Sequence, residues 1–457
     1  MVFLLFPWRF PGSEGRDERR KRSDSLDRSR IQGMAPFGRR RNEGRRNSEA
    51  SRKGELEGVR KTGAVDMRIK AKPDDFAVEE VIHFTPSKKE GPFRVYKLEK
   101  SGWNTSDAIR DAAAKKQVPV KEIRTLGKKD RHALTVQHVS TPAGFDLICR
   151  GEGYSVSFAG FSTKHLEPAV LKGNRFTLVL RDMGEREARL AAARLESVAL
   201  KGFANYFDDQ RFGNVGTKGE FLAEMLVKRR FSAALRKYFS FCHPDAPVYL
   251  KRRKAALAEK WGKWDEMVPF CTEPLLGKML SILRKKGEDG ARECLRLIPA
   301  EEMGMYFSSY SSYLWNETLS RFLAGEDGDY FEIGLKTGPV LQYREMPGEV
   351  FSRLSSEPLP TVGPDMPALP PDMGKVFSGL LAERGVRLSK FRMKEIGQAY
   401  FASFPRRCVV VPGDLKCERE EDPLFPGKLA IRTGFFLPRG SYATMLLKTA
   451  AAGPVTG

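Results

Sequence analysis

The chain has 457 residues, of which 41% are hydrophobic and 30% are charged, and its formal net charge at pH 7 is +21. This hydrophobic content is sufficient for two or three folded domains, so the composition excludes a wholly disordered chain. The positive charge indicates a polyanionic partner, either nucleic acid or an acidic membrane surface.

Metal and disulfide sites are not predicted from the cysteines and histidines. The six cysteines include no C-x-x-C pair, and none of the five histidines is spaced to complete a zinc site. We therefore expect reduced cysteines, no bound metal and a cytoplasmic location. The apolar start at residues 1–8 is too short for a membrane span and lacks the basic region of a signal peptide, so we expect no membrane anchoring there.

Residues 9–66 are rich in Arg, Ser, Gly and Glu and contain almost no aromatic residues. Such a segment cannot bury enough apolar surface to offset its ordering entropy, so we expect a basic, disordered tail over 1–66. Two interpretations stay open. The tail is either an RNA-binding arm or an extension ahead of a true start at Met67, where the sequence first reads as folded.

From residue 67 onwards, strand and helix signals follow one another. A turn at Pro73 and Asp74 leads into a strand through Phe76. The later elements follow from apolar periodicity, from Ser and Thr caps, and from Gly and Pro breakers. They are a strand at 95–99, a helix at 107–116 capped by Thr105 or Ser106 and stopped by Pro119, a strand at 173–181, a helix through 188–198 with Gly202 as C-cap, a proline-rich loop or lid linker at 358–371, and a strand, turn and helix at 429–444 with Ser441 as cap.

Asp130 stands in a short polar loop between two β-prone runs, 123–126 and 133–139, and Gly127 lets the chain turn there. Three cations of the same loop are expected to crowd its carboxylate: Lys128, Lys129 and Arg131. Nearby positive charge keeps a carboxylate ionised, which is what a nucleophile or a general base requires. The alternative is a solvated turn whose charges have no function.

Two regions suit contact with RNA. Arg175 and Arg181 lie an even number of residues apart in the same predicted strand, so one face of that strand is expected to be basic. Between 217 and 405, clusters of Lys and Arg alternate with Tyr, Phe and Trp, a mixture that suits phosphate pairing and base stacking. Aromatic residues at helical spacing are, however, more often part of a core.

Several stretches resemble, in the same order, motifs of the TruD family of RNA pseudouridine synthases. The most specific is Gly-Lys-Lys-Asp-Arg-His-Ala-Leu-Thr-Val-Gln at 127–137, and the next is Ala-Asn-Tyr-Phe-Asp-Asp-Gln-Arg-Phe-Gly at 204–213. The others are the opening strand at 67–80, Gly-Asn-Arg-Phe-Thr-Leu-Val-Leu-Arg at 173–181, the helix at 305–316, and the closing stretch at 429–444.

The resemblance implies an α+β fold, in which a pseudouridine synthase catalytic domain with a mixed, mainly antiparallel sheet is interrupted by an α/β insertion (TRUD) domain. The catalytic domain is expected at 67–216 and 406–450, and the insertion domain at 217–405. The resemblance also implies no cofactor, and tRNA as the substrate with U13 as the target uridine. We further expect a monomer.

The same resemblance assigns the catalytic carboxylate to Asp130, which would act as nucleophile or base on a flipped-out uridine. It makes Phe207 the ring that stacks on uracil and places Asn205 beside the carboxylate. Asp208 replaces the usual Gly and adds a negative charge near the site. The other expected substrate-binding residues are Lys70, Lys129, and Phe76, for which a core position is the alternative.

Other function classes also fit the charge. An RNA-binding protein or chaperone would keep this fold without catalysis, and a basic scaffold protein would leave the ordered motifs unexplained. The sequence contains no G-x-x-x-x-G-K-(S/T) phosphate loop and no G-x-G-x-x-G step between a strand and a helix. An isomerisation that neither gains nor loses a group needs neither motif.

Overall fold

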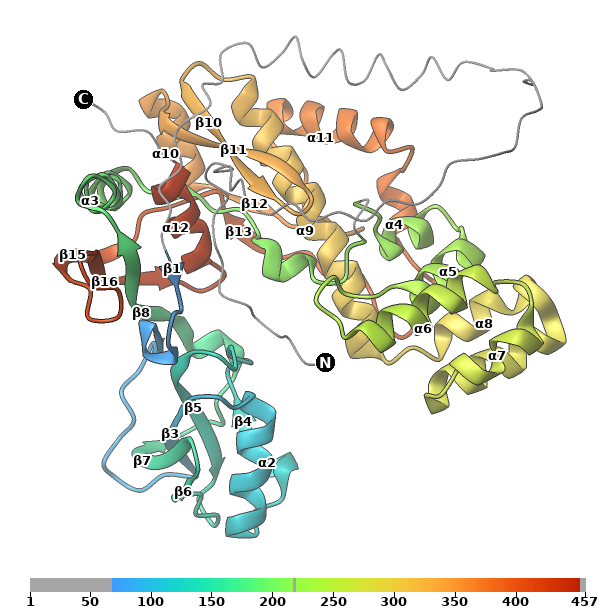
Figure 1. The fold of residues 1–457 in the computed structure, drawn as a ribbon, viewed down its shortest axis with the longest axis horizontal. Helices are drawn as coiled ribbons and strands as arrows, with labels where there is room; N and C mark the ends of the chain where they lie inside the picture. Colours follow the sequence, from blue (N-terminus) through green and yellow to red (C-terminus); the bar gives the residue numbers. More distant parts are fainter. Residues whose placement is uncertain (1–67, 217–218, 453–457) are drawn as a thin grey trace, which may run out of the picture.

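A mixed β-sheet forms one part of the molecule, and helices form most of the rest (Figure 1). The computed structural model describes residues 68–216 and 219–452, so the expected tail at 1–66 and the start at Met67 lie outside the described residues. In this part of the chain the large sheet has ten strands in the order β15-β16-β8-β2-β5-β3-β7-β6, with β1 beside β8 and β4 beside β5. These strands are β1 (Arg68–Ile69), β2 (Phe76–Ile82), β3 (Phe93–Lys100), β4 (Arg124–Thr125), β5 (Leu134–Pro142), β6 (Cys149–Gly151), β7 (Tyr154–Ser162), β8 (Leu171–Met183), β15 (Gly413–Glu421) and β16 (Leu429–Pro438).

The sheet is mainly antiparallel, as expected for the α+β class. The pair β2–β5 is parallel, whereas β8 pairs antiparallel with both β2 and β16, and β3 pairs antiparallel with both β5 and β7. Most of β5 is buried, and it pairs with β2 on one side and β3 on the other. The Asp130 loop leads directly into this central strand.

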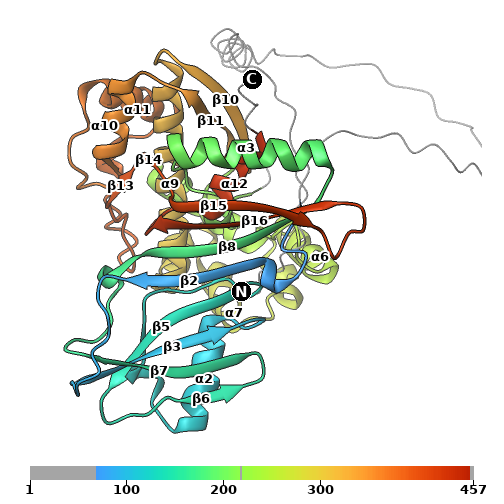
Figure 2. The ribbon, with the colours of Figure 1, turned by 90° about the vertical axis from the view of Figure 1, so that its left-hand side faces the viewer.

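The chain returns to the sheet at its C-terminal end. Strand β16 pairs with β8 over its length, and α3 (Glu185–Lys201) and α12 (Ala443–Ala452) pack against each other over the β15–β16 end of the sheet (Figure 2). Helix α3 ends at Gly202, which has a φ of 71° and donates its N–H to the carbonyl of Val198, so the expected C-cap is confirmed.

The region between the two halves of the sheet is mainly helical and surrounds α9 (Ala300–Ala324), which buries side chains on most of its faces. Three small two-stranded pairings join it: β10 (Asp329–Leu335) with β11 (Gly338–Glu345), β12 (Pro358–Pro360) with β13 (Pro405–Arg407), and β14 (Val409–Val410) with β9 (Phe203–Ala204). Its other α-helices are α4 (Leu222–Val227), α5 (Phe231–Ser240), α6 (Val248–Glu259), α7 (Pro274–Lys286), α8 (Ala291–Arg296), α10 (Gly348–Ser356) and α11 (Pro371–Glu383). The division into domains at 216/217 and 405/406 stays a prediction.

Part of the expected proline-rich loop is a strand. Residues Pro358–Pro360 pair with Pro405–Arg407, and Leu359 between them is buried. Proline is tolerated in such a short edge pairing because the ladder there needs few N–H donors. The pairing has a consequence for the site, because it fixes the position of Arg406.

Two expected helix caps are wrong. Helix α2 (Thr105–Lys116) begins with Asn104 as its N-cap residue, and α12 begins at Ala443, two residues after Ser441. The hydroxyl of Thr105 instead accepts the N–H of Lys129 in the Asp130 loop.

The expected basic face of β8 is also wrong. Arg175 is exposed, but Arg181 is buried, and its guanidinium bonds the carboxylates of Asp75, at 2.7 and 2.9 Å, and of Asp422, at 2.8 Å. Two buried acids therefore neutralise this arginine, and it presents no charge to a ligand.

None of the helices among residues 68–216 and 219–452 combines the length and the apolar character needed to cross a membrane.

Candidate active site

The Asp130 loop is held from behind by a chain of hydrogen bonds. The N–H of Lys129 donates to the hydroxyl of Thr105 (3.0 Å), which donates to the side chain of Gln137 (2.9 Å), and the Gln137 amide donates to the carbonyl of Gly127 (3.0 Å). Because Thr105 begins α2 and Gln137 lies in β5, the loop is tied to two rigid elements. Such support keeps a reacting group in one geometry.

The carboxylate of Asp130 is paired with Lys70, whose Nζ lies 2.6 Å from Oδ2, and Oδ1 accepts the N–H of His132 at 3.0 Å. Burial alone would raise the pKa of Asp130, but the charge and the hydrogen bond of Lys70, together with the His132 N–H, lower that pKa below its ordinary value. The side chain keeps 24% of its surface exposed. Asp130 is thus ionised at neutral pH and still reachable.

Lys70 reaches Asp130 from a strained position, because its φ of 64° lies in the left-handed region that side chains rarely adopt. Its Nζ also lies 4.2 Å from the centre of the Phe76 ring, a favourable contact between a cation and an aromatic face. Phe76 is 6% exposed and meets Phe176 edge-on, so it belongs to the core. One edge of that core therefore supports the lysine that pairs with Asp130.

The three cations of the loop do not pair with the Asp130 carboxylate, which corrects the crowding expected from the sequence. Lys128 pairs with Glu301 (2.5 Å), and Arg131 donates to the carbonyl of Gly102 (2.8 Å). Lys129 donates to Asn174 (2.7 Å) and pairs with buried Glu80 (3.0 Å). Successive side chains of a loop point in different directions, so closeness in sequence does not bring their charges together. The substrate-binding role of Lys129 stays a prediction.

Asn205 and Phe207 form a second group around Arg406, which is almost fully buried. Arg406 donates to the side chain of Asn205 (3.1 Å) and to the carbonyls of Asn205 (2.5 and 3.0 Å) and Tyr206 (3.2 Å). Its guanidinium lies 3.8 Å from the centre of the Phe207 ring. Burial lowers the pKa of Arg406 to about 10, so it remains charged at neutral pH.

The Phe207 ring has no open face in this structure. It is 1% exposed and lies between Arg406 and the edge-on ring of Trp315, while Asn316 bonds both backbone groups of Phe207 at 2.9 Å. Within the described residues, no hydrogen bond, ion pair or ring contact joins this group directly to Asp130. The expected site residues thus form two groups: Lys70, Phe76, Lys129 and Asp130 on the sheet, and Asn205 with Phe207 around Arg406.

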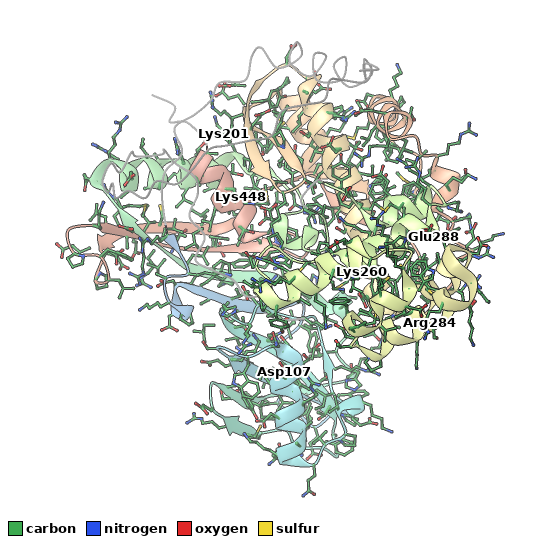
Figure 3. The ribbon with its side chains drawn as sticks, turned by 45° about the vertical axis from the view of Figure 1, so that its right-hand side comes forward. Asp107, Lys201, Lys260, Arg284, Glu288 and Lys448 are labelled. Carbon is green, nitrogen blue, oxygen red and sulfur yellow. The ribbon has the colours of Figure 1, made fainter. Side chains whose placement is uncertain are left out.

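The negative charge that Asp208 adds is neutralised inside the protein. Lys448 on α12 pairs with Asp208 (2.6 Å) and with Asp209 (2.7 Å), and all three side chains are buried. Figure 3 marks Lys448 on its helix. The segment that carries Phe207 is in this way anchored to the C-terminal helix.

Comparisons with known proteins identify the family of this chain. A family model described as tRNA pseudouridine synthase D (TruD) matches residues 58–450. The chain belongs to the TruD family. This membership confirms the expected enzyme class, an RNA pseudouridine synthase.

Individual relatives of this TruD chain come from both archaea and bacteria. The "Probable tRNA pseudouridine synthase D 2" of Methanocaldococcus jannaschii is 30% identical over 402 residues, which cover 85% of this chain and 93% of that protein. The "tRNA pseudouridine synthase D" of Leptospira interrogans is 31% identical over 395 residues, 83% of this chain and 95% of that protein. A solved structure of a Methanosarcina mazei protein named for the same family is 25% identical, with a TM-score of 0.65 over 87% of this chain and 97% of that one.

Sequence reasoning on this TruD chain missed Lys100. It is the last residue of β3 and is 1% exposed, and its Nζ donates to the backbone carbonyl of Asp130 at 2.8 Å. Lys100 lies an even number of residues after the buried residues Tyr96 and Leu98 in the same strand, so its side chain points to the same face. This alternation was the signal in the sequence that could have predicted its burial. Burial lowers the pKa of Lys100 to about 8, against the raising effect of Asp130.

We expect Lys100 to position Asp130 and to give the activity of this TruD protein a pH limit. Lys100→Met should lower kcat by about tenfold to a hundredfold, because a small displacement of a reacting group is costly. In the wild type, kcat should fall as the pH rises through about 8, where the ammonium that holds the loop is lost. Rates measured from pH 6 to 9.5 check this, and the variant should lack the decline.

Stability should change with pH in the opposite direction. The pKa of Lys100 is lower in the folded state than its ordinary value of 10.5, so the unfolded state binds more protons between pH 8 and 10.5. The contribution of Lys100 to the free energy of unfolding therefore rises with pH in that window. A loss of activity that only followed a loss of stability would contradict the positioning role.

Proposed function

We propose that this protein converts uridine to pseudouridine in tRNA, with U13 as the target and Asp130 as the reacting carboxylate. Membership of the TruD family and relatives named as tRNA pseudouridine synthases support the reaction and the substrate. The observation that carries the residue assignment is the ion pair between Lys70 and Asp130, within a loop tied to α2 and β5. It gives an ionised carboxylate that is neither free in solvent nor fully buried.

The reaction breaks the bond between C1′ and N1, turns the uracil, and forms a bond between C1′ and C5. The C5 proton leaves and N1 gains one, so the product is an isomer of the substrate. An ionised Asp130 is suited to attack C1′ or shield it as the base departs, as in retaining glycosidases, or to take a proton from the ribose. Lys70 orients the carboxylate in each route.

The target uridine has to leave its stack to reach a carboxylate in a loop, at a cost of roughly a few kcal/mol. Stacking on an aromatic ring restores part of that cost. Phe207 and Asn205 are the groups proposed to meet the uracil. For the uracil to stack on Phe207, Arg406 has to leave the face of that ring. We also propose that the protein acts as a monomer in the cytoplasm, which size-exclusion chromatography with light scattering and cell fractionation test.

The test of the proposed function uses the purified full chain and unmodified tRNA transcripts. Carbodiimide labelling followed by primer extension, or mass spectrometry of nuclease fragments, detects pseudouridine at single positions. We expect one modified position, U13, in tRNAs that carry a uridine there. Pseudouridine only at other positions would overturn the U13 assignment, and no pseudouridine in any transcript would overturn the function.

Binding of tRNA should weaken steeply with salt, because a chain of net charge +21 binds phosphates by releasing counterions. Between 50 and 200 mM salt, the affinity should fall about tenfold or more. Filter binding or fluorescence anisotropy measures this. A flat salt response would contradict RNA as the polyanionic partner.

A further inference from the structure

A cavity of about 630 Å³ lies between the Phe207 segment and the helical region. Residues that follow Phe207 form one side of the cavity. Residues of α5, α6, α7 and α9 form other sides, and Tyr442, just before α12, also lines it. Its volume falls in the range of about 300 to 1,000 Å³ that is common for small-ligand sites. Asp130 does not line this cavity, so the cavity is a separate site from the one proposed at Asp130.

The walls of the cavity combine aromatic rings with charged groups. Tyr238, Phe241, Tyr306 and Tyr442 contribute the rings. Single-stranded RNA is recognised by stacking of bases on such rings and by hydrogen bonds to the base edges. The aromatic lining therefore suits a flat nucleobase.

The charged groups of the lining suit the other parts of a nucleotide. The structure records no hydrogen bond or ion pair for Lys254 within the residues it describes, and the Nε of Arg211 is buried without a hydrogen-bond partner. Arg211 also donates to the hydroxyl of Ser308 (3.4 Å), and Lys254 lies near the carboxylates of Glu273 and Glu302. Both cations line the cavity and are suited to meet phosphate or base acceptors. Glu302 presents a carboxylate, which is bonded by Tyr238 (3.4 Å) and is suited to accept the amino group of a base. Burial raises the pKa of Glu302, in keeping with its place inside the cavity.

Two series of contacts link the surroundings of this cavity to the Asp130 loop. On one side, Lys128 pairs with Glu301, the neighbour of Glu302 in α9. On the other side, Lys129 bonds Asn174, which pairs with Leu437 of β16, and β16 leads within a few residues to Tyr442. A nucleotide close in sequence to one at Asp130 can therefore reach the cavity.

We propose that this cavity binds a second unpaired nucleotide of the RNA substrate, a neighbour of the target uridine, whose base carries an exocyclic amino group. This inference rests on the proposed function. The base stacks on Tyr306, its amino group donates to Glu302, and Lys254 or Arg211 meets the adjacent phosphate.

The test is a binding cycle between protein and RNA variants. The nucleotide before the target uridine and the nucleotide after it are replaced in turn by an abasic nucleotide. The Kd of each RNA for the protein is measured by filter binding. For the wild type we expect one position to cost about tenfold in affinity, the effect of one lost base stack. Tyr306→Phe keeps the ring and should retain this loss of affinity. Tyr306→Leu should bind the intact RNA and the abasic RNA equally weakly.

A second cycle tests the exocyclic amino group of the flanking base whose removal weakened binding in the first cycle. Replacing that base by uridine should weaken binding by the wild type about fivefold, and Glu302→Met should remove this preference. Glu349→Met, a change of an exposed carboxylate that does not line the cavity, should keep it.

Both cycles use Kd, so they do not depend on catalysis. If pseudouridine forms but no flanking position responds, or if Tyr306→Leu keeps the full cost of the abasic nucleotide, the base pocket is wrong and the proposed function stands. If the cycles hold but no pseudouridine forms, the proposed function is wrong and the pocket stands as an RNA-binding site.

Discussion

Asp130→Asn is expected to lower the rate of pseudouridine formation by about 10⁴-fold or more, the scale seen when a reacting group is removed. Asparagine has nearly the same shape but carries no negative charge, so it neither attacks C1′ nor takes a proton. It keeps an oxygen that can accept the His132 N–H, and the support from Thr105 and Gln137 is unchanged. Single-turnover measurement with excess protein separates the chemical step from product release.

The affinity for tRNA should change by less than about threefold in this variant, because phosphate contacts carry most of the binding. Asp107→Asn serves as the control, since Asp107 is an acid on the surface of α2, in the same part of the molecule (Figure 3). It should leave the rate unchanged. An Asp130→Asn protein that keeps its activity would rule out the assignment, and a wild type that binds tRNA without modifying it would favour the RNA-binding alternative.

Lys448→Met is expected to lower the free energy of unfolding by about 3 to 5 kcal/mol, because it leaves two buried carboxylates without their partner. Asp208 and Asp209 both bond Lys448, and Asp209 also accepts the N–H of Lys336 at 2.7 Å. Urea denaturation followed by circular dichroism measures the change. The Phe207 segment should loosen first, since these residues anchor it to α12.

Two further variants decide whether the charge is the cause. Lys201→Met removes a lysine that is 41% exposed and pairs with Glu345 at the surface (Figure 3), so it should cost less than about 1 kcal/mol. Adding Asp208→Asn and Asp209→Asn to Lys448→Met should restore most of the lost stability. If the triple variant stayed as unstable as Lys448→Met, packing rather than unpaired charge would be the reason.

Local signals predicted much of the sheet and the turn that carries Asp130. Gly127 and the β-prone runs on either side of Asp130 correspond to the turn between β4 and β5, and Gly202 caps α3 as its position suggested. These features depend on a few neighbouring residues, and backbone preferences act over that range. The TruD motifs extended the prediction to segments that meet only in the folded protein.

The partners of the site residues could not be predicted from local signals. Asp130 pairs with Lys70 rather than with a cation of its own loop. Arg406 meets Asn205 and Phe207 from a strand that lies at the expected domain boundary, 405/406. Each of these contacts joins residues far apart in the chain.

The sequence by itself determined the enzyme family and the α+β class, and it pointed to Asp130 as the candidate reacting carboxylate, because motif order and short-range periodicity are properties of the chain. Only the tertiary structure decided which cation holds that carboxylate, that Arg406 covers Phe207, and that Lys448 balances Asp208 and Asp209. The physical reason is that a buried charge takes the partner that packing places within hydrogen-bond distance, and packing depends on the whole fold rather than on neighbours in sequence.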